Sequence, residues 1–155
     1  MGIALSTAGV TIGYAVEETV GERPTTGYKN IPDVKSIPEM NPEPETLEST
    51  TLAETEYKTY IEGLKDLGGA LSFTANFTTE LETEWAALVA AYQTAKAGNK
   101  SVWFEVKHPS LTKSVFFAGQ PSAMGLPEMS VNSILETNLY ITPTNAPVWE
   151  TKTTA

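Results

Sequence analysis

The stretch 70–78 constrains the fold most strongly, because apolar and polar residues alternate along it without a break. The apolar positions are Leu71, Phe73, Ala75 and Phe77. Successive side chains of a strand point to opposite faces of the sheet, so this alternation predicts a strand with one buried face. We therefore expect residues 70–78 to lie directly on the core.

An amphipathic helix is predicted immediately after this strand, over about 80–97. Thr79 and Glu82 have the spacing of a capping box, in which each side chain binds the backbone amide of the other residue. A stripe of apolar residues at spacings of three and four then follows, formed by Leu81, Trp85, Leu88, Val89 and Tyr92. Such a stripe is typical of a helix packed on a sheet.

The remaining segments indicate β structure. Residues 9–17 alternate as in a half-buried strand, and 46–52 are β-prone. Residues 101–108 and 112–120 are expected to pair as a hairpin with its turn at 109–111, and 129–143 to form one longer strand or two short ones. Five prolines in 24–44 exclude a helix and leave room only for short edge strands.

These elements predict a mainly β fold with one α-helix, arranged as an antiparallel sandwich or barrel. The chain of 155 residues has the size of one domain. We expect a single domain over 1–155 with flexible arms at about 1–8 and 144–155.

Charge and composition exclude several functions. A net charge of −9 without clustered Lys and Arg makes binding to nucleic-acid phosphates implausible. The chain has no cysteine, so neither disulfides nor thiolate metal sites are available. No apolar run approaches the length of about 20 residues that a membrane span needs, and the apolar start at 1–16 lacks the basic residues of a signal peptide.

The sequence also gives little support to catalysis or metal binding. His108 is the only histidine, and Ser110 two residues later does not make a catalytic pair with it. The acidic pairs, Glu43 with Glu45 and Glu54 with Glu56, lack the loop spacing of a calcium site. We expect no catalytic, metal-binding or cofactor-binding residues and no cofactor.

Adjacent aromatic residues occur in both strands of the expected 101–120 hairpin, as Trp103–Phe104 and Phe116–Phe117. Neighbouring residues of a strand face opposite sides, so each pair predicts one ring in the core and one on the second face. A water-facing sheet with such rings would expose a large apolar patch. Trp103, Phe104, Phe116 and Phe117 are therefore candidates for contact with another subunit.

The stretch 53–69 is expected to be a long loop, and it lies in an acidic region that also contains large apolar residues. From Glu39 to Asp66 there are eight acidic residues and two lysines. A disordered linker would lack large apolar residues, whereas this region contains Leu47, Leu52, Tyr57, Tyr60, Ile61 and Leu64. We interpret it as a loop that docks on a partner.

The order of these segments resembles the major tail tube proteins of long, flexible-tailed bacteriophages. The resemblance covers about 9–143 and depends on segment order, on size, and on the segments "TTL" at 50–52 and "YIEGLKD" at 60–66. It implies a β-sandwich-like core flanked by a helix, and subunits that form hexameric rings stacked into a tube for genome ejection. Within that family the long loop, which matches 51–66 here, reaches an adjacent ring.

The resemblance implies a non-enzymatic structural protein of the virion, assembled in the cytoplasm of the host bacterium. Its partners would be copies of itself and the tape measure, tail terminator and distal tail proteins. No contact with a membrane is expected. DNA would pass through the lumen without specific binding, which suits an acidic chain. The expected inter-ring stacking residues are Thr51, Leu52, Tyr57, Tyr60, Ile61, Leu64 and Asp66.

Two other functions remain open from the sequence. One is a sandwich module that binds glycans or belongs to a baseplate. The other is the tube protein of a contractile injection or type VI secretion system.

Overall fold

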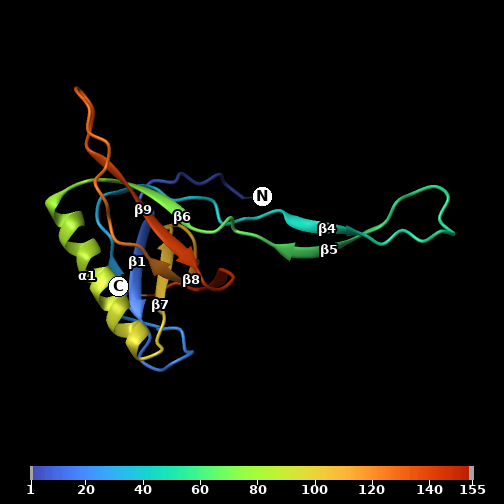
Figure 1. Ribbon diagram of the computed structural model, residues 1–155, viewed down its shortest axis with the longest axis horizontal. Coiled ribbons are helices and arrows are strands. Elements are labelled where there is room, and N and C mark those ends of the chain that lie inside the picture. The colour runs from blue at the N-terminus through green and yellow to red at the C-terminus, as the bar shows by residue number, and fades with distance from the viewer. Residues whose placement is uncertain (1, 154–155) are drawn as a thin grey trace.

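The computed structural model describes residues 2–153 and shows a curled antiparallel sheet, one helix against it, and a long hairpin that projects from this body (Figure 1). The strands are β1 (Thr11–Val16), β2 (Lys29–Asn30), β3 (Val34–Ser36), β4 (Pro44–Glu48), β5 (Tyr60–Lys65), β6 (Leu71–Asn76), β7 (Val102–Lys107), β8 (Lys113–Pro121), β9 (Glu136–Pro143) and β10 (Val148–Thr151). The helix α1 spans Thr79–Ala97. The prediction of a mainly β fold with one helix is confirmed.

The main sheet has the strand order β2-β1-β7-β8-β9-β6-β3, and all of its pairs are antiparallel. Strand β8 is long enough to have two partners on one edge, β10 along Lys113–Phe116 and β9 along Gly119–Pro121. At Gly119 an added Cβ would lie 2.6 Å from the Ile141 side chain, so this close approach requires glycine. The sheet curls into a half-barrel (Figure 1).

The core lies between the curled sheet and α1, as the sequence predicts. Alternate residues of β6 are buried, namely Leu71, Phe73 and Ala75, and the helix buries Leu81, Trp85, Leu88, Tyr92 and Ala95. Trp85 contributes its ring to this core while its Nε1 donates a hydrogen bond to the Ser122 carbonyl at 2.9 Å. The strand at 70–78 and the helix at about 80–97 are thereby confirmed.

The helix begins one residue earlier than expected, and its cap is Thr78 rather than Thr79. Thr78 has extended φ and ψ angles, and its hydroxyl accepts a hydrogen bond from the Leu81 amide at 3.1 Å. The same hydroxyl donates to Asp33 Oδ2 at 2.6 Å. Contact with the 31–36 segment, which no local pattern reveals, favours Thr78 as the cap.

The hairpin predicted between 101–108 and 112–120 is confirmed by the pairing of β7 with β8, and 129–143 contains one strand, β9. The predictions for 46–52 and 53–69 were wrong in part. Strands β4 and β5 pair with each other in a separate two-stranded sheet, so 46–52 does not enter the main sheet and Tyr60–Lys65 is a strand. Both faces of this ribbon are exposed, so its residues lack the alternation that a core imposes.

The second face of the sheet is covered at Phe116 by the chain itself. Phe104, Phe116 and Phe117 are each 0% exposed, and Trp103 is half-buried. The Arg23 guanidinium lies 4.2 Å above the Phe116 ring, and the Tyr28 ring meets Phe116 edge-on. The expectation that another subunit covers one ring of the 116–117 pair is therefore corrected, because the 23–28 segment already does so.

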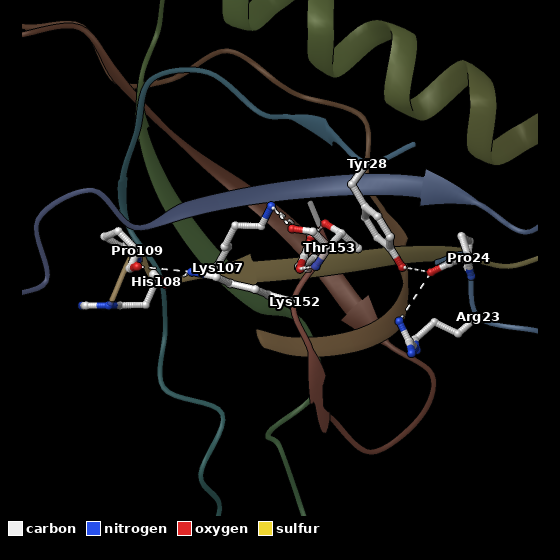
Figure 2. A network of polar contacts seen from close by, with 9 residues as sticks. Arg23, Pro24, Tyr28, Lys107, His108, Pro109, Lys152 and Thr153 are labelled. Carbon is white, nitrogen blue, oxygen red and sulfur yellow. Dashed lines mark hydrogen bonds and ion pairs between the residues drawn. The ribbon is translucent and has the colours of Figure 1, made fainter. Parts of the chain in front are cut away.

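The C-terminal segment is fastened to the sheet by a polar network (Figure 2). The buried carboxylate of Glu105 accepts hydrogen bonds from the Thr153 amide and hydroxyl at 3.1 and 2.6 Å. Lys107 Nζ donates to the Thr153 carbonyl at 2.9 Å, and Lys152 Nζ to the carbonyls of His108 and Pro109. Part of the expected C-terminal arm thus forms β10 and this network; Met1, Thr154 and Ala155 lie outside the described residues.

Candidate assembly surface

The feature that distinguishes this molecule is the β4–β5 hairpin, which extends far from the body (Figure 1). We call residues 44–65 the projecting hairpin. Its large apolar side chains are left uncovered by the rest of residues 2–153: Leu52, Tyr57, Tyr60 and Ile61 are more than half exposed, and Leu64 is 85% exposed. Leaving such side chains in water forgoes about 1.5 to 3 kcal/mol each. Their burial by a partner would be favourable.

Apolar side chains occupy both faces of the ribbon. Leu47 and Ile61 are directly paired across β4 and β5, so they share one face. Tyr60 pairs with Glu48, one residue out of phase with Ile61, and therefore lies on the other face. The register shifts between Glu62 and Lys65, which interrupts the alternation before Leu64. A ribbon with this arrangement can be covered on two sides at once.

The tip of the projecting hairpin is ordered by its own hydrogen bonds. Thr59 donates its amide to Thr50 Oγ1 at 2.8 Å, and Ser49 donates to the Thr59 carbonyl at 2.8 Å. Beyond them the Glu54 carboxylate accepts from the backbone amides of residues 55, 56 and 57. Hydrogen bonds from the amides of Glu56 and Tyr57 are the main reason why the pKa of Glu54 is lowered.

The structure brings together most of the residues expected to stack. Thr51, Leu52 and Tyr57 lie in the tip, and Tyr60, Ile61 and Leu64 lie in β5. Asp66 follows β5 at the base, where its Oδ1 accepts from the Gly68 amide at 2.8 Å and fixes a turn. The four aromatic interface candidates, Trp103, Phe104, Phe116 and Phe117, belong to β7 and β8 of the main sheet and are not part of this surface.

Two further surfaces were not predicted from the sequence. Residues 123–134 form a second projection that exposes Leu126, Met129, Val131 and Ile134. A groove of about 1000 Å³ lies at the base of the projecting hairpin, lined by residues of 37–42, 65–69 and 143–149 together with Val106 and Val115. Exposed apolar residues beside Gly125 and Pro127 were a signal for the first; the groove is formed by segments distant in sequence and had none.

His108 has both ring nitrogens occupied by the backbone. Its Nε2 lies 2.6 Å from the Ser6 carbonyl, and its Nδ1 accepts from the Ser110 amide at 3.0 Å. This pattern fits a neutral ring with the proton on Nε2. The contacts give His108 a role in joining 6–8 to the 108–111 turn.

Within residues 2–153, no group of three or more His, Cys, Asp and Glu side chains is placed to hold a metal ion. In the same range, the helix is not long and apolar enough to cross a membrane. The two buried glutamates are used structurally. Glu105 holds Thr153, while Glu17 accepts from the Gly21 and Ser101 amides and from Trp103 Nε1.

Comparison with known proteins gives a structural result only. No protein-family model and no curated protein sequence matches the chain. A chain of "Cryo-EM structure of the anti-feeding prophage (AFP) baseplate, 6-fold symmetrised" has a similar fold, with a TM-score of 0.57 and 8% sequence identity. The similarity covers 97% of this chain and 98% of that one. At this identity the match shows a shared fold over the full length.

Proposed function

We propose that this protein is a structural subunit of a phage-type tail, which assembles with copies of itself into stacked hexameric rings around a channel for the genome. The observation that carries the proposal is the projecting hairpin, whose apolar side chains are exposed on both faces. An element that is exposed on both faces adds little buried apolar surface to the fold of one copy. A partner that covers it would gain the burial of six large apolar side chains, Leu47, Leu52, Tyr57, Tyr60, Ile61 and Leu64.

The full-length fold similarity to a chain of a prophage baseplate supports a place in a tail assembly. The net charge of −9 supports a channel through which DNA slides without binding, because like charge disfavours contact with phosphates. In this proposal the subunit is not an enzyme and needs no cofactor. The tape measure, tail terminator and distal tail proteins are its proposed partners, and the flexible-tailed virion is its proposed location.

A second candidate is a ring-forming subunit of a contractile injection system. The similar chain belongs to a baseplate rather than to a flexible tail tube, and this favours the second candidate. Both candidates require ring formation, so they share the first test. Electron microscopy of assemblies grown with a candidate sheath or tape measure protein separates them.

The first test removes two anchors from the projecting hairpin by combining Leu64→Asp with Tyr60→Ser. Both side chains are exposed, so circular dichroism and the melting temperature should stay within error of the parent chain. Anchor residues of interfaces are commonly worth 1 to 2 kcal/mol or more each. The concentration at which rings or tubes appear by light scattering and negative-stain microscopy should therefore rise by about tenfold or more.

Val20→Asp is the matched control, because Val20 is 56% exposed and lies outside the projecting hairpin. It introduces the same charge at an apolar site, and assembly should persist. Unfolding of the double variant would show that Tyr60 and Leu64 support the body instead. Parent protein that stays monomeric at all salt and protein concentrations would contradict the proposed function.

A further inference from the structure

A second apolar surface lies away from the projecting hairpin. We call residues 123–134 the apolar projection. Within it Leu126 is 85%, Met129 62%, Val131 88% and Ile134 71% exposed. In Figure 1 this segment rises from the body in orange above the start of α1, while the projecting hairpin extends to the right.

The base of the apolar projection is fixed on both sides. Ser122 donates its amide to the Tyr140 carbonyl at 3.0 Å and accepts from Trp85 Nε1 at 2.9 Å. At the other end the Leu135 carbonyl accepts from the Phe77 amide at 2.9 Å. These contacts tie the segment to α1, β6 and β9, so its direction is set by the core of the molecule.

The segment also has local structure of its own. Asn132 adopts a left-handed φ of 59°, a conformation that asparagine tolerates better than most residues. The hydroxyls of Ser130 and Ser133 are 3.0 Å apart across this turn. Val131 is exposed in this turn, which the hydrogen bond between the Ser130 and Ser133 hydroxyls spans.

The groove at the base of the projecting hairpin offers apolar side chains for a partner to contact. Its volume is about 1000 Å³, and its apolar lining includes Ile37, Met40, Leu67, Val115, Pro147 and Trp149. Trp149 is 59% exposed, so the described residues leave more than half of its surface uncovered. An exposed apolar projection and a groove with a partly apolar lining thus occur in one chain.

Charge opposes contact between these two surfaces of different copies less than contact between acidic surfaces. Glu128 is the only charged residue in 122–135, and the charged side chains that line the groove, Lys65 and Asp66, have opposite signs. Two copies that each carry a net charge of −9 repel one another wherever acidic surfaces meet. The apolar projection and the groove are nearly neutral, so they can approach with little repulsion.

The topology places the two surfaces at opposite ends of one strand. The apolar projection enters β9 at Glu136, and the groove is lined by Pro143 and the residues that follow it. A strand of eight residues is about 23 Å long from first to last residue. Contact between different surfaces of two copies is head-to-tail, and repetition of such a contact closes a ring when the rotation allows it.

We infer that the apolar projection of one copy binds in the hairpin-base groove of a second copy, and that this contact joins neighbours within a ring. The inference rests on the proposed function and names the surface for lateral contact. It is separate from stacking through the tip of the projecting hairpin. Leu126 and Val131 are the anchors, and Trp149 is their main partner in the groove.

The absence of cysteine in the chain allows a direct test with single-cysteine variants. Val131→Cys carries a thiol on the apolar projection, and Asn41→Cys carries one at the exposed edge of the groove. Mixed in equal amounts with an added thiol oxidant, the two variants should give a disulfide-linked dimer as the main product. Val131→Cys mixed with Gln93→Cys, an exposed position on α1, should give at least fivefold less.

Three outcomes would overturn the inference. The first is a yield from the Asn41 pair that equals the Gln93 control while the parent protein assembles. The second is an intramolecular disulfide in the Val131→Cys, Asn41→Cys double variant at high dilution, which would place the apolar projection in its own groove. The third is a cross-linking yield that is unchanged by Leu126→Asp, which removes a proposed anchor.

A tip variant separates this inference from the proposed function. Leu52→Asp with Tyr57→Ser changes only the tip of the projecting hairpin, outside the residues that line the groove. Loss of tubes with retained cross-linking supports both ideas as independent contacts. Retained tubes with retained cross-linking contradicts stacking through the tip and leaves the lateral contact supported.

Discussion

At the residue scale, three side chains cover part of the second face of the sheet: Arg23, Tyr28 and Phe116. Arg23 lies over the Phe116 ring, and Tyr28 contacts the same ring. The Tyr28 hydroxyl donates a hydrogen bond to the Pro24 carbonyl at 2.9 Å (Figure 2). Burial raises the pKa of Tyr28 to about 12, despite the nearby Arg23 charge, which lowers it. Arg23 and Tyr28, which lie far from β8 in the sequence, thereby cover Phe116 on the second face of the sheet.

The raised pKa of Tyr28 predicts a loss of stability in alkaline solution. The folded state keeps its phenol proton above the ordinary value of 10, so between pH 10 and about 12 the folded state binds more protons than the unfolded state. The free energy of unfolding should therefore fall as pH rises through this window. Tyr28→Phe should flatten that dependence, measured by urea unfolding at a series of pH values.

Tyr57→Phe serves as the control for this prediction, because Tyr57 is exposed in the tip of the projecting hairpin. It should leave the alkaline decline as in the parent chain. An unchanged decline in Tyr28→Phe would show that the loss of stability above pH 10 has another origin.

At the element scale, α1 is positioned by its cap as much as by its apolar stripe. Thr78 joins α1 to the turn before β3, because its hydroxyl accepts a hydrogen bond from the Leu81 amide and donates one to Asp33. A capping box at Thr79 would place the start of the helix one residue later. The bond to Asp33 decides between them, and it comes from a residue 45 positions away.

Replacement of the two threonines tests this assignment. Thr78→Ala removes the cap and should lower the free energy of unfolding by about 1 to 2 kcal/mol. Thr79→Ala lies at the first helical position and should change it by about 0.5 kcal/mol or less, since alanine is a strong helix former. Chemical denaturation of both variants measures the difference, and equal losses would contradict the structural assignment of the cap.

At the scale of the whole molecule, acidity and apolar projections act against each other. In the proposed assembly, the net charge of −9 opposes contact between copies, whereas burial of the apolar side chains exposed on the projecting hairpin and the apolar projection would favour it. The balance depends on ionic strength, because salt screens exposed charges and leaves apolar contacts intact. Assembly is thus expected to be under electrostatic control.

We expect added salt to promote assembly. Between about 0.01 and 0.15 M the Debye length falls from about 30 to about 8 Å, so repulsion between copies weakens. The protein concentration at the onset of light scattering should fall severalfold over this range. A rise in that concentration with salt would indicate that ion pairs, rather than apolar side chains, hold the copies together.

The sequence by itself determined the elements that have one buried face. The alternation of Leu71, Phe73 and Ala75 and the stripe from Leu81 to Tyr92 were sufficient, because burial on one side imposes a period that can be read locally. The acidic composition and the apolar residues of 47–64 also predicted that this segment contacts a partner, but they did not predict that it forms a pair of strands.

Only the tertiary structure decided what covers each face and where each strand pairs. Pairing of β4 with β5 outside the main sheet and coverage of Phe116 by Arg23 and Tyr28 involve exposed or distant residues, and neither leaves a periodic signal. The groove at the hairpin base likewise joins segments about 100 residues apart, from Ile37 to Trp149. Long-range contacts of this kind depend on the geometry of the folded chain, so they cannot be read from local patterns of residues.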